Sequence, residues 1–219
     1  MKVLIHACPA RMWYVSEYLV PELTRQGVER IEIYNDARQI GNLRACIDSM
    51  ERLRTDGDTW HLQDDVLPAS DFAERARELD NFSGVICGFV NEIGGPNANL
   101  TGLQPAKDMW YSFPCIRIPD CMARQFAAWV KAGGDGGTTA RDLIQRNVGD
   151  DWFFRRFYKS YYASTPVLHC KPCLVQHVDH LLGGSLCSPW RGYYTPAAYW
   201  DEPEREAALK EWICARVND

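Results

Sequence analysis

Residues 59–68 read TWHLQDDVLP, an apolar run that ends in two adjacent carboxylates. The run follows turn residues at 56–58 and predicts a buried strand over 59–63. Asp64 and Asp65 would lie at the carboxyl end of that strand, where open α/β sheets bind ligands. Adjacent like charges repel unless solvent, a hydrogen-bond network or a cation offsets the repulsion. Taken alone, these residues leave a metal or ligand site and a solvated turn both open.

The segments before this strand alternate between strand and helix patterns. An apolar run predicts a strand over 3–5, and alternating polar and apolar residues predict another over 29–34. Apolar residues at helical spacing predict helices over 12–26 and 41–54, with Pro21 expected to break or kink the first. This order predicts an α/β fold, a single domain with a mostly parallel central sheet flanked by helices. Further strands are expected at 84–90, 112–118, 167–169 and 173–177, helices at 71–79 (capped by Ser70), 120–131, 139–146, 150–162 and 203–216, and a loop at 91–108.

The composition is that of an ordinary globular protein. The 219 residues are 46% hydrophobic and 24% charged, which excludes intrinsic disorder. The formal charge of −5 excludes a polycation coated in basic residues and leaves room for a local basic groove. Without a secretory leader or an apolar run of about 18 residues, a cytoplasmic protein with no membrane span is expected.

The cysteine content agrees with a reducing compartment. Nine cysteines cannot all pair within one chain, so reduced thiols are expected. The only CxxC motif is Cys170–Cys173, preceded by His169. Small buried side chains are the favoured interpretation of this group, and a three-ligand zinc site is the alternative.

A second acidic pair precedes a segment rich in basic and aromatic residues. Asp150 and Asp151 fall at the expected start of a helix, where capping and the helix dipole favour carboxylates whatever the function. The basic and aromatic residues beyond them suit phosphate contact and stacking on bases or sugars. Aromatic side chains in the core with charges facing solvent would give the same pattern. The candidate contact residues are Arg155, Arg156, Lys159, Trp190 and Tyr193.

Several segments match one family of motifs in chain order. The acidic segment is followed by Pro68 and by Asp71-Phe72, and residues 172–178 read PCLVQHV. These features resemble nucleotide-sugar glycosyltransferases of the GT-A fold, particularly the lipooligosaccharide and procollagen galactosyltransferase-like enzymes. The matching segments are 1–10 with Arg11, 31–36, 41–42 with Arg44, 59–68, and 172–178 with Ser185, which together span residues 1–188.

The resemblance implies a metal-dependent enzyme that moves a sugar from a nucleoside diphosphate, with a UDP-sugar as the expected donor. Asp65 would be the main ligand of Mn²⁺ or Mg²⁺, and Asp64 would assist at the metal or the ribose. His177 would complete the metal shell. His180 is the alternative, because the family's usual glycine two residues after this histidine is Asp179 here. The implied donor-binding residues are Arg11, Asn35, Asp36, Arg44 and Asp64.

By the same resemblance, Asp151 would deprotonate the acceptor hydroxyl in an inverting displacement, with Asp150 as the alternative base. Residues 1–90 would bind the nucleotide sugar and residues 91–219 the acceptor, within one domain. A compact enzyme of this kind also resembles phage enzymes that glycosylate 5-hydroxymethylpyrimidines in DNA within the host cytoplasm. The acceptor is therefore expected to be such DNA, or a saccharide or lipid-linked glycan.

Three other classes are compatible with parts of the sequence. A nucleotidyltransferase also pairs acidic residues with a metal, but the glycine-rich N-terminal loop of that family is absent, since residues 7–11 read ACPAR. A cysteine hydrolase lacks any distinctive spacing of cysteine and histidine. A catalytically inactive DNA- or glycan-binding module would keep the fold, and the intact acidic residues argue against it.

Overall fold

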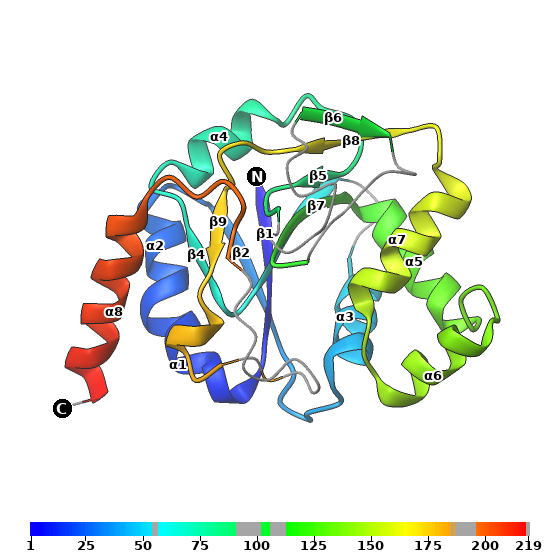
Figure 1. Ribbon diagram of the computed structural model, residues 1–219, viewed down its shortest axis with the longest axis horizontal. Helices are drawn as coiled ribbons and strands as arrows, with labels where there is room; N and C mark the ends of the chain where they lie inside the picture. Colours follow the sequence, from blue (N-terminus) through cyan, green and yellow to red (C-terminus); the bar gives the residue numbers. More distant parts are fainter. Residues whose placement is uncertain (54–56, 91–101, 106–112, 185, 187–195, 218–219) are drawn as a thin grey trace.

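The computed structural model describes residues 1–53, 57–90, 102–105, 113–184, 186 and 196–217. Seven strands form one sheet in the order β2-β1-β3-β7-β5-β8-β6, with helices on both faces (Figure 1). The strands are β1 Lys2–Ala7, β2 Arg30–Asn35, β3 Asp58–Gln63, β5 Ile86–Cys87, β6 Gly102–Pro105, β7 Cys115–Pro119 and β8 Pro166–His169.

The sheet is mixed, and most of its strands share one direction. β1 is parallel to both β2 and β3. β7 is antiparallel to β3 and to β5, so β5 and its parallel neighbour β8 run the same way as β1. β6 is antiparallel to β8. Five of the seven strands therefore point one way, which confirms the predicted α/β fold with a mostly parallel sheet.

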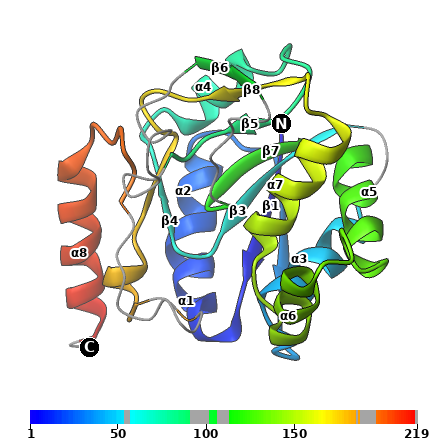
Figure 2. The same cartoon turned by 45° about the vertical axis from the view of Figure 1, so that its right-hand side comes forward.

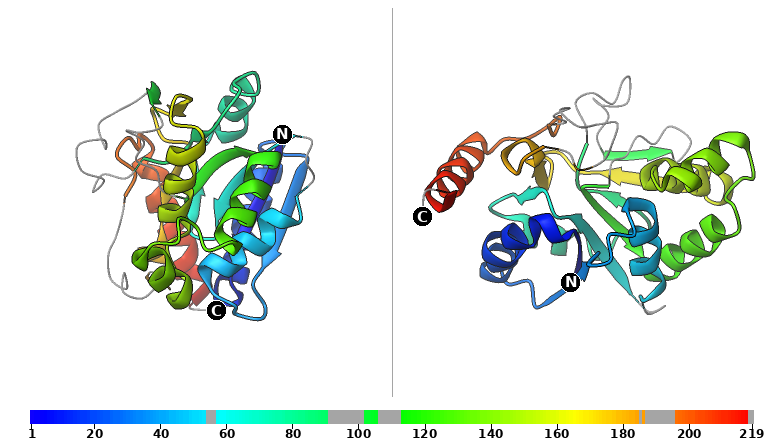
Figure 3. Two further views of the ribbon diagram at one scale, coloured as in Figure 1. Left: turned by 90° about the vertical axis from the view of Figure 1, so that its right-hand side faces the viewer. Right: turned by 90° about the horizontal axis from the view of Figure 1, so that it is seen from below.

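The helices that follow β1 and β2 lie on opposite faces of the sheet (Figure 3). After β1 the chain forms a short 3-10 turn, Pro9–Arg11, and a helical segment made of α1 Met12–Tyr14, a π-helical turn Val15–Leu19 and α2 Val20–Arg25. After β2 it forms α3 Asn42–Glu51. The β1–β2 connection therefore crosses one face of the sheet and the β2–β3 connection crosses the other. The two connections lead to opposite sides of β1, so they diverge between β1 and β3.

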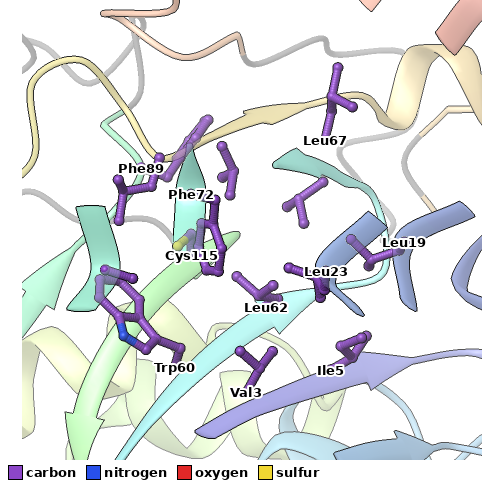
Figure 4. Close-up of a cluster of buried hydrophobic side chains, with 14 of the residues drawn as sticks. Val3, Ile5, Leu19, Leu23, Trp60, Leu62, Leu67, Phe72, Phe89 and Cys115 are labelled. Carbon is purple, nitrogen blue, oxygen red and sulfur yellow. The ribbon is translucent and has the colours of Figure 1, made fainter. Parts of the chain in front are cut away.

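Alternate residues of β1 and β3 explain the two-sided arrangement. Val3 and Ile5 join a cluster with Trp60 and Leu62, which the α1–α2 side covers (Figure 4). Leu4 instead joins the cluster under α3. Strand side chains alternate between faces, so apolar residues at consecutive positions produce a strand that is buried on both sides.

The remaining helices lie close to their predicted ranges. α5, α6 and α7 are on the α3 side of the sheet (Figure 2). Trp212 of α8 packs against the first helical segment, 6.1 Å from Trp13 and 5.1 Å from Tyr18 between ring centroids. No helix within the described ranges combines the length and apolar character that a membrane crossing needs. The helices after α3 have the bounds α4 Phe72–Glu78, α5 Asp120–Lys131, α6 Thr138–Arg146, α7 Asp150–Tyr161 and α8 Pro203–Val217.

Two local details differ from the predictions. The predicted break at Pro21 is absent, because the chain stays helical through this residue; Pro21 lies at the start of α2, and the turn before it is π-helical. Ser70 does not cap α4, because Asp71 holds the cap position and the Ser70 hydroxyl donates to Glu202 Oε1 at 3.0 Å. The expected loop at 91–108 contains strand β6, and its other residues up to 101 and from 106 lie outside the described ranges.

Candidate functional site

The acid pair, Asp64 and Asp65, lies where β3 ends at the carboxyl edge of the sheet. Both residues are buried, with 6% and 7% of their surface exposed, so the solvated-turn interpretation is wrong. The loop that follows β1 lies beside them, since the backbone N–H of Cys8 donates to Asp64 Oδ2 at 2.7 Å. This position between β1 and β3, where the connecting helices diverge to opposite faces, is the usual ligand-binding crevice of open α/β sheets.

Arg11 supplies a cation to the acid pair. Its Nη1 donates to Asp64 Oδ1 at 3.0 Å and also to Asp65 Oδ2. Its Nη2 donates to the carbonyl of Gly184 at 2.7 Å. Arg11 is itself 4% exposed, so a buried guanidinium offsets the repulsion between the two buried carboxylates. Of the three ways of offsetting the repulsion, the structure shows a hydrogen-bond network, and Arg11 is at its centre.

His177 reaches the acid pair from a small second sheet. β4 Val66–Pro68 and β9 Val175–His177 are antiparallel, with Val66 opposite His177. His177 Nε2 lies 3.2 Å from Asp65 Oδ2, and the backbone N–H of Val178 donates to the Asp65 carbonyl at 2.8 Å. His180 Nε2 instead lies 3.0 Å from Glu206. The structure therefore brings His177, rather than His180, to the acid pair.

The two carboxylates differ in their electrostatic surroundings. Burial would raise the pKa of Asp65, but the nearby His177 and the Arg11 guanidinium together hold that pKa well below its usual range. Burial and the charge of Asp65 raise the pKa of Asp64. Burial alone would lower the pKa of His177, and the Asp65 carboxylate outweighs it to leave the pKa raised. Asp65 is consequently the carboxylate that stays ionised most readily.

Asp150 and Asp151 are the first two residues of α7, which lies on the same face of the sheet as α3. The Asn42 amide, at the start of α3, donates to Asp150 Oδ1 at 2.9 Å. Burial, and then the neighbouring Asp151, raise the pKa of Asp150 to about 7. Asp151 is exposed, and its Oδ1 accepts a hydrogen bond from the Trp152 N–H at 2.6 Å. One acid is therefore accessible, and the other is buried with a pKa close to neutrality.

The implied donor-binding residues do not all gather at the acid pair. Asp36 is buried, and its carboxylate accepts backbone hydrogen bonds from Ile40 and Gly41 at 2.9 and 3.0 Å, so it holds the turn between β2 and α3. Asn35 is exposed at the end of β2. Arg44 is exposed on α3 and lines a hollow of about 320 Å³ with residues of α5 and α6. Of the five implied donor-binding residues, the structure brings Arg11 and Asp64 into contact, by a hydrogen bond of 3.0 Å.

The basic and aromatic residues of α7 separate onto two faces. Phe154, Phe157 and Tyr158 are buried in the core and do not offer stacking platforms. On the outer face, Trp152, Arg155, Arg156 and Lys159 line a hollow of about 220 Å³. The Arg156 guanidinium lies 4.7 Å from the Trp152 ring centroid and also pairs with Asp135. Trp190 and Tyr193 lie outside the described residues.

Sequence reasoning missed a chain of polar side chains between β1, β3 and α3. His6 Nε2 lies 3.0 Å from His61 Nδ1, and His6 Nδ1 lies 3.1 Å from the Ser49 hydroxyl. Burial lowers the pKa of His6 to about 4. The three residues come from β1, β3 and α3. Alternation of side chains between the two faces of adjacent strands puts both histidines on the face that α3 covers, and this pattern could have revealed the pair.

The two carboxylates suit a hard divalent cation in type, because carboxylate oxygens are preferred ligands of Mn²⁺ and Mg²⁺. Asp65 Oδ1 is buried and accepts no hydrogen bond from any described residue, which leaves one ligand atom open. Of the other three carboxylate oxygens, Asp64 Oδ1 and Asp65 Oδ2 accept from Arg11, and Asp64 Oδ2 accepts from the Cys8 N–H. Across the described ranges, no three acidic, histidine or cysteine side chains are gathered as a formed metal site, so the zinc alternative at 169–173 gains no support.

The fold and site define a class, an α/β protein with a buried cluster of charged side chains at the carboxyl edge of its sheet. No family model matches the sequence, and no curated protein is similar to it. Among solved structures, it is similar to the galactosyltransferase LgtC bound to donor and acceptor sugar analogues (10% identity, 96% of this chain and 95% of that chain, TM-score 0.49).

Two further similar structures are glycosyltransferases. The apo form of GlyE from Streptococcus pneumoniae is 11% identical over 99% of this chain and 64% of that chain, with a TM-score of 0.47. A Drosophila β1,4-galactosyltransferase 7 mutant, in complex with manganese, UDP-Gal and xylobiose, is 13% identical over 94% of this chain and 74% of that chain, with a TM-score of 0.37. At these scores the likeness transfers no residue role, and the function has to be argued from the site.

Proposed function

We propose that this chain is a glycosyltransferase that moves a sugar from a nucleoside diphosphate to an acceptor hydroxyl. The observation that carries the proposal is the buried acid pair at the switch point of the sheet, held by Arg11 and flanked by His177. Burying this many charges is costly, and a fold gains nothing in stability from such a cluster that apolar residues would not supply. A crevice of this kind is typical of a site for a charged ligand.

The same residues would hold the divalent cation. We propose Asp65 as the main ligand, with Asp64 and His177 as the others. When bound, Mn²⁺ or Mg²⁺ would supply a Lewis acid that stabilises the negative charge of the departing diphosphate. The chain's own contribution is to keep Asp65 ionised at neutral pH and to exclude water from the carboxylates.

The transfer itself would be a direct, inverting displacement. The bond between the anomeric carbon and the diphosphate oxygen breaks as the acceptor oxygen bonds to that carbon, and the hydroxyl proton passes to a carboxylate. Asp151 is the proposed base because it is exposed at the start of α7. Asp150 is the alternative because its pKa of about 7 suits proton transfer near neutrality.

Two acceptors remain as proposals. Arg155, Arg156 and Lys159 line one hollow on α7, and their three positive charges favour a phosphate-bearing acceptor, such as DNA with 5-hydroxymethylpyrimidines. The burial of most α7 aromatic rings weakens the idea that they receive a flipped base and favours a saccharide or lipid-linked glycan. Mass spectrometry of nucleosides from treated hydroxymethylated DNA separates them, since an unchanged mass with every donor removes the DNA acceptor.

The function is tested by thermal shift with UDP-, GDP- and CDP-sugars, each with and without Mn²⁺. One nucleotide sugar should raise the melting temperature in the presence of Mn²⁺, and Asp65→Asn should remove that rise. The matched control is Asp71→Asn, which alters an exposed carboxylate paired with Arg75. If no nucleotide sugar raises the melting temperature, the proposed transferase function is wrong. Stabilisation without sugar transfer or donor hydrolysis would instead support the inactive binding module.

A further inference from the structure

Arg11 and a divalent cation compete for the same oxygens. The guanidinium bonds Asp64 Oδ1 and Asp65 Oδ2, which are the atoms that a cation between the two carboxylates would use. The one open atom, the buried Asp65 Oδ1, offers a single ligand position. Two cations sharing the acid pair would repel each other across a few ångströms in a poorly solvated place.

Arg11 as it is placed cannot serve an incoming diphosphate. Its Nη1 and Nη2 are both donating within the protein, and the side chain is 5% exposed. The Nε atom is buried and has no acceptor among the described residues. A diphosphate arriving at the acid pair would therefore find the Arg11 guanidinium turned inward to the two carboxylates.

We propose that Arg11 is the resident counter-ion of the acid pair and leaves it when a divalent cation binds. This inference rests on the proposed function, since it describes how the same crevice becomes ready for a nucleotide sugar. The exchange replaces one positive charge with two, so the crevice gains net positive charge when its anionic ligand arrives. It also frees the guanidinium to contact that anion.

The exchange would reach beyond the acid pair. Arg11 Nη2 holds the carbonyl of Gly184, which ends the segment after His177. Gly183 and Gly184 have φ values of +94° and +85°, which glycine adopts readily. Departure of Arg11 removes this hydrogen bond, so cation binding is coupled to the backbone at 183–184.

The test measures Mn²⁺ alone by electron paramagnetic resonance of the free ion, without nucleotide. Arg11→Met removes the competing charge and keeps most of the side-chain volume, so it should bind Mn²⁺ at least about tenfold more tightly than the unchanged protein. The control is Arg38→Met, an exposed arginine paired with Asp48, which should leave the affinity unchanged. Adding Asp65→Asn to Arg11→Met should abolish the gain.

A second measurement covers the case in which Arg11→Met does not fold. In the unmodified protein labelled with [¹⁵N]arginine, saturating Mg²⁺ and UDP should shift the Arg11 Nε–H resonance, assigned by its loss in Arg11→Lys. Three results would overturn the exchange. The folded Arg11→Met variant could bind Mn²⁺ with the affinity of the unchanged protein, or neither protein could bind Mn²⁺. The third is an Arg11 resonance that does not move when Mg²⁺ is bound.

Failure of the exchange and failure of the function give different results. If nucleotide sugars stabilise the protein and are used while Arg11→Met leaves Mn²⁺ affinity unchanged, the exchange is overturned and the transferase stands. If Arg11→Met tightens Mn²⁺ binding and no nucleotide sugar binds, the exchange stands for a crevice with another anionic ligand.

Discussion

His6 and His61 lie in contact across two parallel strands, with Nε2 of His6 3.0 Å from Nδ1 of His61 and the rings stacked 5.3 Å apart. One of these two nitrogens donates and the other accepts, so the accepting nitrogen carries no proton. Protonation of the accepting nitrogen would remove the hydrogen bond and set two N–H groups against each other. Burial also lowers the pKa of both rings, so the native state favours their neutral forms.

The histidine pair predicts a loss of stability on mild acidification. Burial lowers the pKa of His6 from 6.5 to about 4, so between those values the unfolded chain binds more protons than the native one. The free energy of unfolding should then fall as pH drops from about 6.5 towards 4, by about 2 kcal/mol for His6 after allowance for its partial exposure. Urea unfolding of His6→Gln at several pH values across this range should show a smaller change of the unfolding free energy with pH than the unchanged protein does.

Asp150 predicts a pH dependence of the opposite sign. Its native pKa of about 7 is above the ordinary value of 3.8, so the native state holds the proton more tightly than the unfolded chain. The stabilising contribution of this group is present below pH 3.8 and is lost as pH rises through 7. Asp150→Asn keeps the hydrogen-bonding shape without a charge, so its melting temperature relative to the unchanged protein should increase between pH 5 and pH 8. A constant difference would show that Asp150 is ionised in the fold at both values.

Leu62 lies on the strand that ends in the acid pair, and its burial predicts a large loss of unfolding free energy when its side chain is shortened. It is fully buried in β3, between Val3 and the α1–α2 side (Figure 4). Leu62→Ala should lower the free energy of unfolding by about 3 kcal/mol, because it leaves a cavity that the neighbouring strands cannot close. Ile33→Ala, at a residue 42% exposed on the outer strand β2, should change it by about 0.5 kcal/mol or less. Similar losses at the two positions would contradict the assigned core.

Asp36 predicts a structural rather than a ligand-binding effect. Its two carboxylate oxygens accept the N–H groups of Ile40 and Gly41, and these donors would be left without a partner in Asp36→Ala. Unfolding free energy should fall by about 2 kcal/mol. If Asp36 instead holds the ribose, Asp36→Asn, which keeps one of the two accepting oxygens, would weaken nucleotide-sugar binding by more than its smaller loss of stability accounts for. Denaturant unfolding and donor titration of both variants separate these roles.

The sequence was sufficient for elements that depend on local periodicity. The helix predicted at 120–131 is α5 with the same bounds, because its apolar residues recur at helical spacing. The strand at 59–63 and the position of the acid pair at its end also follow from a local pattern. The expected crevice needed only one further rule, that ligands bind at the carboxyl edge.

Features that depend on pairing between distant residues were not predictable. The antiparallel direction of β7 and the pairing of β4 with β9 depend on sheet register, which no local pattern encodes. The pairing of Arg11 with Asp65 joins residues 54 positions apart. On α7, periodicity marks Phe154 and Phe157 as one face, but only the packing under α5 shows that this face is the core.

The outer face of α7 predicts which acceptor the protein uses. Replacing Arg155, Arg156 and Lys159 together with Gln removes three positive charges beside the α7 hollow and no buried aromatic ring, so stability and donor binding should be retained. With a DNA acceptor, transfer should weaken steeply with salt in the unchanged protein, and the triple variant should show a smaller slope because fewer counterions are released from the phosphates. Arg30→Gln, at an exposed arginine paired with Glu32 on β2, is the matched control. A neutral glycan acceptor would instead give no salt dependence, since no phosphate charge is exchanged for a basic side chain, and KM measured against salt therefore separates the two acceptors.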